Sequence, residues 1–245
     1  MRKVIWVLAV IAILAAPAAA EHNRELTKAV CVLIDFSEST KNARMDYRKA
    51  LGSIIEKLAM GDSVYIAKIT EKSRMEPQPL LEQDFVPEKE PVNEFWRKQE
   101  RAKMAKKIKE VGGRAQQAMD GKTGLSGKTA LLDSLQVAER VFKHYRKDKS
   151  ILVIMSDMIE DGRYNFERED LSYKGISRII DRQRRQELIP DLKGVKVYVV
   201  GASVPKGVSP ERYDQVERFW LRYLKETGAQ MPKEDYGSSL IGFRE

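Results

Sequence analysis

Two short apolar runs constrain the fold of this chain more than any other feature of its sequence. Residues 29–34 (AVCVLI) and 151–155 (ILVIM) are apolar at every position and rich in β-branched side chains. A strand that is apolar on both faces must be buried on both faces, which is typical of a parallel sheet covered by helices on its two sides. Residues 64–69 and 195–201 are two further strand candidates.

Helical patterns alternate with these strands. Apolar residues recur at helical spacing from Tyr47 to Leu58, from Leu131 to Tyr145, and from Val216 to Leu224. Each pattern predicts a helix with one face packed on a core. The alternation of strand and helix therefore predicts an α/β fold with a doubly wound, mostly parallel open sheet. In such sheets ligands bind at the carboxyl ends of the strands.

Residues 71–126 interrupt this alternation, and we expect them to form a helical insertion within one domain that spans residues 27–245. The insertion begins with a proline-rich stretch that favours a loop or an edge strand. Residues 94–119 then have the pattern of a helix, which the adjacent Gly112 and Gly113 should break or kink.

The predicted insertion helix is strongly basic, because Lys and Arg far outnumber Asp and Glu between residues 97 and 114. Such a face could contact an anionic membrane surface or an acidic protein, or it could simply be solvated. No aromatic side chains are interleaved with these charges, so nucleic acid is not an expected partner.

The first twenty residues have the composition of a targeting segment. Arg2 and Lys3 precede an apolar run over residues 4–16, and Ala18-Ala19-Ala20 is an A-x-A cleavage pattern. We therefore predict a signal peptide over residues 1–20 and export to the periplasm or the cell surface. An uncleaved anchor is the alternative, but the run is short of the ~20 apolar residues that a spanning helix needs. The single cysteine of the chain rules out an internal disulfide or a cysteine-based zinc cluster.

Oxygen-bearing side chains follow the predicted strands at the edge where ligands bind. Asp35, Ser37 and Ser39 alternate in the segment after the first strand, so their oxygens can converge. Thr129 directly precedes a predicted helix, and Asp157 follows the strand over 151–155. Carboxylate and hydroxyl oxygens are hard donors that suit Mg²⁺ or Mn²⁺, and Mg²⁺ prefers six oxygens. The sequence thus predicts one metal site, unless these residues only cap helix N-termini.

This combination resembles a von Willebrand factor type A (VWA) domain with its metal-ion-dependent adhesion site. The family pattern is D-x-S-x-S after the first strand, a Thr before a later helix, and an Asp after the fourth strand. The resemblance covers residues 27–228. Most members follow the last Asp with Gly, whereas this chain has Met158, which leaves the local turn open. The matching residues are Asp35, Ser37, Ser39, Thr129 and Asp157.

The resemblance implies protein binding and not catalysis. Ser37, Ser39 and Thr129 would hold the ion directly or through water, while Asp35 and Asp157 would lie close by, partly as hydrogen-bond acceptors. A carboxylate from a partner protein would complete the coordination of the Mg²⁺ or Mn²⁺. The expected function is that of an exported metal-dependent module that recruits or scaffolds a partner protein.

A metal-dependent hydrolase, similar to a phosphoesterase, is the alternative that uses the same site. It would need more carboxylates at the ion, and Glu38, Glu160 and Asp161 are near enough in sequence to be considered.

Several other features have simpler interpretations. The segment from Gly121 to Thr129 has five residues between its glycines where a phosphate-binding loop needs four, so a nucleotide site is not expected. We expect Cys31 to be a buried apolar residue and His144 to be a surface residue. The arginines at positions 178, 182, 184 and 185 are expected on a solvated helix face.

Overall fold

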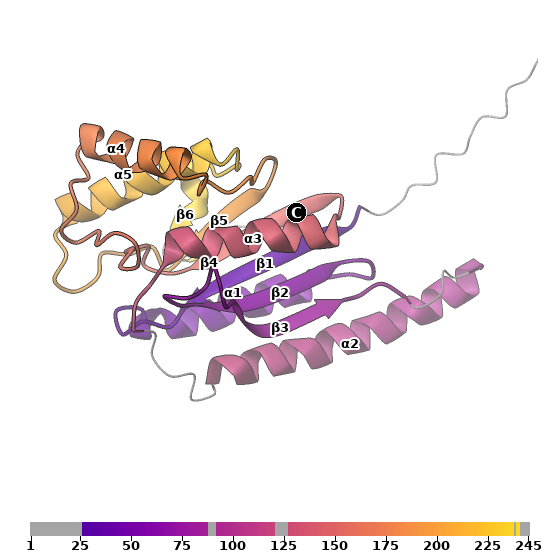
Figure 1. The fold of residues 1–245 in the computed structure, drawn as a ribbon. Coiled ribbons are helices and arrows are strands. Elements are labelled where there is room, and N and C mark those ends of the chain that lie inside the picture. The colour runs from indigo at the N-terminus through magenta and orange to yellow at the C-terminus, as the bar shows by residue number, and fades with distance from the viewer. Residues whose placement is uncertain (1–25, 88–91, 121–126, 238, 241–245) are drawn as a thin grey trace, which may run out of the picture.

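The computed structural model describes residues 26–87, 92–120, 127–237 and 239–240 (Figure 1). The predicted signal peptide (1–20) and residues 121–126 of the glycine-rich segment lie outside these ranges. The described residues form a six-stranded sheet of order β3-β2-β1-β4-β5-β6 with five α-helices around it. The strands are β1 (Lys28–Asp35), β2 (Ser63–Ile69), β3 (Gln78–Asp84), β4 (Lys149–Met155), β5 (Lys196–Val200) and β6 (Tyr236–Gly237). The helices are α1 (Arg44–Glu56), α2 (Glu94–Asp120), α3 (Leu131–Tyr145), α4 (Tyr173–Arg185) and α5 (Pro210–Glu226), with short 3-10 helices η1 (Lys41–Ala43) and η2 (Lys233–Asp235).

The pairing of the strands confirms the predicted doubly wound, mostly parallel sheet. β1 lies in the centre and pairs in parallel with both β2 and β4, and β4 continues in parallel to β5 and β6. β3 pairs antiparallel with β2 at the edge of the sheet. It contains Pro79, which lacks an N–H and is therefore tolerated at an edge. Of the two alternatives for the proline-rich stretch, the edge strand is the one observed.

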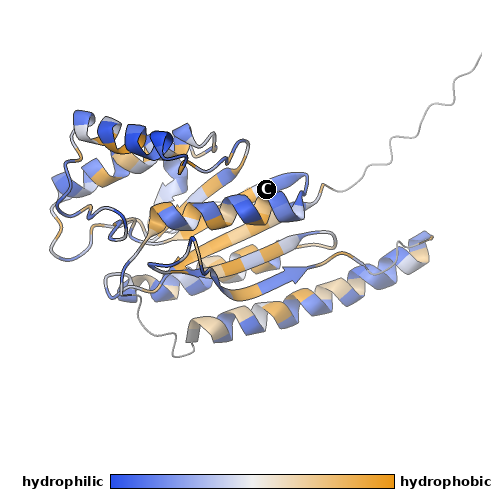
Figure 2. Ribbon diagram, in the orientation of Figure 1, coloured by the Kyte–Doolittle hydropathy of each residue, from blue (hydrophilic) through white to orange (hydrophobic). Residues whose placement is uncertain are grey.

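Alternate residues of the central strand enter two separate cores. Val30, Val32 and Ile34 pack with the apolar faces of α1 and α2, whereas Cys31 and Leu33 pack with those of α3, α4 and α5. Figure 2 shows the apolar central strands between helices whose outer faces are hydrophilic. Burial on both faces is therefore the physical reason for the apolar runs in the sequence.

Helix α2 is one continuous helix of 27 residues, so the predicted break at Gly112 and Gly113 is wrong. A Cβ atom at Gly112 would lie 2.9 Å from Cγ2 of Ile55 on α1, whereas a Cβ at Gly113 would meet nothing within 4 Å. Gly112 thus allows α2 to pack closely on α1. The buried apolar face of α2 compensates for the weak helix propensity of the two glycines, and consists of Met104, Ile108, Val111, Ala115 and Met119.

Cys31, His144 and the arginines of α4 lie where the sequence predicts them. Cys31 is fully buried, and His144 is exposed at the end of α3. The four arginines of α4 are exposed, and Arg184 pairs with Asp181 and Glu226 at 2.7 Å in each case. None of the helices in the described part of the chain is both long enough and apolar enough to cross a membrane.

Candidate metal-binding site

The candidate site lies where the winding of the sheet reverses direction. From β1 the chain continues to β2 and β3 on one side, and it later returns to β4 on the other side of β1. Ile34 of β1 is in register with Met155 of β4, so the residues that follow both strands emerge side by side. The loops diverge at such a switch point and leave a crevice at the carboxyl ends of the strands, which is where open α/β sheets bind ligands.

Asp35 is the organising residue of this crevice and is fully buried. Its Oδ1 accepts a hydrogen bond from the backbone N–H of Ser37 at 2.7 Å and a longer one from the hydroxyl of Thr129 at 3.4 Å. Its Oδ2 accepts a hydrogen bond from the hydroxyl of Ser156 at 2.8 Å. Asp35 thereby brings together three chain segments that are far apart in sequence.

The loop after β1 presents its hydroxyl groups in a defined arrangement. The Oγ atoms of Ser37 and Ser39 lie 3.0 Å apart. The buried Thr40 donates its hydroxyl hydrogen bond to the backbone carbonyl oxygens of Asp35 and Ser37, each at 3.0 Å. This local side-chain-to-backbone bonding holds the loop in a turn, so the two serine oxygens face the same space.

Asp157 contributes a second buried carboxylate next to the first. Its Oδ1 accepts the backbone N–H of Ile159 at 3.1 Å, but its buried Oδ2 accepts no hydrogen bond from any residue that the structure describes. Burial, together with the negative charge of Asp35, raises the pKa of Asp157 to about 6, and the Ser39 hydroxyl and the Ile159 N–H oppose this shift. A bound cation would neutralise the two carboxylates and give Asp157 Oδ2 a partner.

Tyr47 on α1 adds another buried polar group close to the carboxylates. Burial raises the pKa of its phenol well above the ordinary value, and the charges of Asp35 and Asp157 raise it further. Within the described ranges, its hydroxyl oxygen has no hydrogen-bond partner. A Cβ at Gly201, just after β5, would lie 2.6 Å from this oxygen, so glycine is needed there for the close approach.

The turn after Asp157 forms with Met158 in the position where the family pattern has glycine. Its φ of +67° lies in the left-handed region that glycine adopts most readily. The turn is held by two hydrogen bonds: the Met158 N–H donates to Ser156 Oγ at 3.0 Å, and its carbonyl oxygen accepts from Trp220 Nε1 at 2.7 Å. The side chain is fully buried in the core that contains α3 and α5. Tertiary contacts therefore hold a methionine where the family pattern has glycine.

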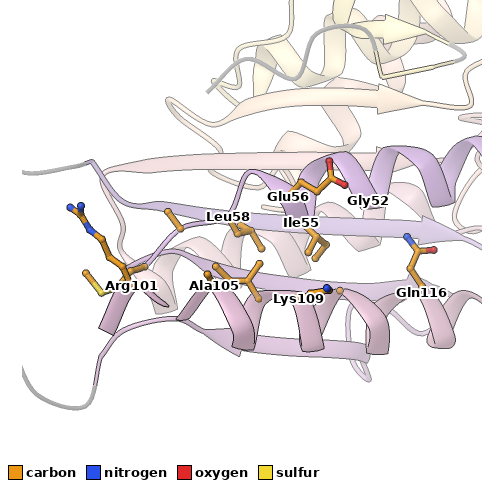
Figure 3. Close-up of a pocket in the computed structure, with 12 residues that line it drawn as sticks. Gly52, Ile55, Glu56, Leu58, Arg101, Ala105, Lys109 and Gln116 are labelled. Carbon is orange, nitrogen blue, oxygen red and sulfur yellow. The ribbon is translucent and has the colours of Figure 1, made fainter. Parts of the chain in front are cut away.

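A cavity of about 350 Å³ opens beside these groups. Ser39 and Asp157 form part of its wall, and Lys206 lies on its lining from the loop after β5. A larger cavity, of about 670 Å³, lies elsewhere, between α1 and α2 (Figure 3). None of the five predicted site residues lines this larger cavity, whereas Ser39 and Asp157 line the smaller one, so we place the candidate site at the smaller cavity.

The five residues predicted from sequence thus lie around one crevice at the carboxyl edge of the sheet. Their donors are two carboxylates and three hydroxyls, all hard oxygen ligands, and this set fits Mg²⁺ or Mn²⁺. Sequence reasoning missed Ser156, Thr40 and Tyr47. Ser156 could have been found, because it directly follows the apolar run of β4 next to Asp157; Tyr47 could not, because only the tertiary packing of α1 brings it here.

The carboxylates considered for the hydrolase alternative are engaged in other contacts. Glu160 is buried and accepts the backbone N–H groups of Leu132, Gly162 and Arg163, at 3.0, 3.0 and 2.9 Å. Burial raises its pKa to about 7. Glu38 pairs with Lys41 at 3.1 Å, and Asp161 accepts Asn165 Nδ2 at 3.1 Å. In the ranges that the structure covers, no three or more Asp, Glu, His or Cys side chains gather as a metal cluster.

Comparison with known proteins concerns the fold. No family model matches this sequence, and no curated protein matches it. Similar solved structures include a von Willebrand factor type A protein from Catenulispora acidiphila, with 14% identity and a TM-score of 0.40 over 83% of this chain and 43% of its own. They also include the SpRpn10 VWA domain, with 14% identity and a TM-score of 0.43 over 84% of this chain and 87% of its own. The PilB minor pilin from Streptococcus sanguinis has 14% identity and a TM-score of 0.49 over 89% of this chain and 58% of its own.

The chain thus spans less than two thirds of the Catenulispora and Streptococcus structures. Similarities this low carry no argument about function. The strand order, the antiparallel edge strand and the covering helices of this chain are those of a doubly wound, mostly parallel α/β sheet, as the sequence predicts.

Proposed function

We propose that this protein is an exported protein-binding module that holds one Mg²⁺ or Mn²⁺ at the carboxyl edge of its sheet. Ser37, Ser39 and Thr129 would supply hydroxyl ligands, and the carboxylates of Asp35 and Asp157 would balance the charge. The ion would offer an unfilled coordination position to a carboxylate of a partner protein. Lys206, on the lining of the adjacent cavity, would attract the same acidic group.

The observation that carries this proposal is the buried Oδ2 of Asp157. In the described part of the chain it accepts no hydrogen bond, and burial, followed by the negative charge of Asp35, raises the pKa of its carboxyl group. Leaving a buried anionic oxygen without a donor is costly, so the arrangement is stable only when something positive or hydrogen-bonding fills the place. The neighbouring hydroxyls of Ser37 and Ser39 make a hard cation the best candidate.

The test compares melting temperatures in Mg²⁺ and in EDTA for the wild type and two matched variants. Asp157→Asn removes the charge with little change in shape. Asp161→Asn does the same at an Asp whose carboxylate accepts a hydrogen bond from Asn165. We expect Mg²⁺ to raise the melting temperature of the wild type and of Asp161→Asn, by ~2–8 °C. Asp157→Asn should lose this increment, and in EDTA it should be at least as stable as the wild type.

Equal melting temperatures of the wild type in Mg²⁺ and EDTA would contradict the metal site. The binding function has its own test, a pull-down from the native cell envelope with the same three proteins. Capture of a partner should require Mg²⁺ and should be lost with Asp157→Asn. Capture that is unchanged by EDTA and by Asp157→Asn would contradict the mechanism. Mg²⁺-dependent turnover of a phosphodiester, if Asp35→Ala abolishes it, would favour the hydrolase instead.

A further inference from the structure

The first part of helix α2 is largely exposed. Buried residues of α2 begin only at Met104, so the first ten residues of the helix bury no side chain. Figure 1 shows this end of α2 extending beyond the edge of the sheet. A helix end that buries no apolar side chain gains little from packing, so the fold does not explain its exposed apolar residues.

The projecting end carries large apolar side chains. Val92, Phe95 and Trp96 are 87%, 64% and 48% exposed. The rings of Phe95 and Trp96 contact each other edge to face, with centroids 5.6 Å apart. Single exposed apolar residues are common on protein surfaces, but a contiguous group that includes two aromatic residues marks a contact surface.

Basic side chains follow this apolar tip along the helix. Lys98, Lys106 and Lys109 are exposed, whereas Arg97 and Lys103 pair with Glu94 and Glu100 on the same helix. Aromatic residues at a polar boundary, flanked by lysines, are typical of segments that lie in the interface of a bilayer with anionic lipids. An acidic protein would match the charge, but it would not account for aromatic rings presented at the tip.

We propose that the projecting end of α2 is a membrane-binding surface that inserts Phe95 and Trp96 among the headgroups of an anionic bilayer. The lysines would add electrostatic attraction to the lipid phosphates. The apolar tip accounts for the position of the contact, and the basic helix for its preference for anionic lipid. This inference does not depend on the metal site, which lies at the opposite edge of the sheet.

The test uses a chain that begins at Glu21, because the described fold starts at residue 26 and the apolar run over residues 4–16 would bind lipid by itself. Vesicles with 30% phosphatidylglycerol are compared with vesicles of phosphatidylcholine alone. In this chain the tryptophans are Trp96 and Trp220, and Trp220 is fully buried, so a change in emission reports on Trp96. We expect binding to the anionic vesicles and a blue shift of the Trp96 emission.

The variants separate this surface from other exposed groups. The double variant Phe95→Ser/Trp96→Ser should weaken binding about tenfold or more. Lys98→Gln and Lys106→Gln should each weaken it about fivefold and reduce its salt dependence. Tyr173→Ser, at an exposed aromatic residue of α4, should bind as the wild type does.

Three results would overturn the proposal. The first is a lack of binding to anionic vesicles at low salt, and the second is binding that persists in the Phe95→Ser/Trp96→Ser variant. The third is a concentration-dependent dimer in sedimentation that this double variant abolishes, since the same surface would then be an interface between two copies of the chain.

Discussion

Met158 shows at the scale of one residue how tertiary contacts determine a backbone conformation. Its φ of +67° costs a residue with a Cβ ~1 kcal/mol relative to glycine, yet its side chain is completely buried. Substitution can separate the cost of the positive φ from the stabilisation by the buried side chain. Both Met158→Gly and Met158→Ala should lose ~2–5 kcal/mol of unfolding free energy, because both remove the buried side chain.

The order of the two variants is the informative result. At position 158 the glycine variant should be more stable than the alanine variant by ~1 kcal/mol, because glycine adopts the left-handed conformation without strain. At Met155, which is equally buried but lies in strand β4, alanine should be the more stable. Urea denaturation measures both pairs, and an alanine variant that is the more stable at both positions would contradict the argument.

Ser156 is the second residue whose role can be isolated. Its hydroxyl donates to Asp35 Oδ2 and accepts the N–H of Met158, so it links the first carboxylate to the turn. Ser156→Ala should lower the unfolding free energy by ~1–3 kcal/mol, because it leaves a buried carboxylate oxygen without this donor. Ser53→Ala, at an exposed position of α1, is the control, with an expected change within ~0.5 kcal/mol. Equal effects of the two substitutions in urea denaturation would contradict this role of Ser156.

Helix α2 illustrates, at the scale of an element, why neighbouring glycines are not equivalent. Gly113→Ala should stabilise the protein by ~0.5–1 kcal/mol, because alanine is the better helix former and the added Cβ meets nothing within 4 Å. Gly112→Ala adds the same propensity but places its Cβ 2.9 Å from Ile55 Cγ2. It should therefore be less stable than Gly113→Ala by ~1–3 kcal/mol in thermal or urea unfolding. If the two variants were equally stable, the close contact of α2 with α1 would not hold.

The elements differ in how far the sequence alone can predict them. β1 and β4 were predictable to within one or two residues, because burial on both faces requires apolar residues at every position. The two residues of β6 were not, because they pair with β5 only through the tertiary fold. The break expected in α2 failed for the same reason: propensity is local, whereas the contact between Gly112 and Ile55 is not.

The candidate site, too, could be predicted only in part from the sequence. Asp35, Ser37, Ser39, Thr129 and Asp157 could be selected from sequence because each follows a strand or precedes a helix, and the topology brings these positions together. The partnerless oxygen of Asp157 and the approach of Tyr47 depend on side-chain packing, which no spacing of residues reveals.

At the scale of the whole molecule, the metal site and the projecting end of α2 lie at opposite edges of the sheet (Figure 1). The 27 residues of α2 alone span ~40 Å between these edges. We therefore expect the two proposed activities to be separable. Phe95→Ser/Trp96→Ser should keep the full rise of melting temperature in Mg²⁺, and Asp157→Asn should keep wild-type binding to anionic vesicles. Loss of both activities in either variant would show that the two ends are coupled.

The position of Cys31 has a practical consequence for all of these measurements. The residue lies in the central strand, in register with Tyr65 on one side and Leu152 on the other, and burial raises the pKa of its thiol. Its side chain packs in the core that α3, α4 and α5 cover, so a labelling reagent can reach this sulfur only when that helical layer separates from the sheet. The chain has no other cysteine. The rate at which a chromogenic disulfide modifies Cys31 therefore measures how often this core opens, in native buffer and without an engineered probe.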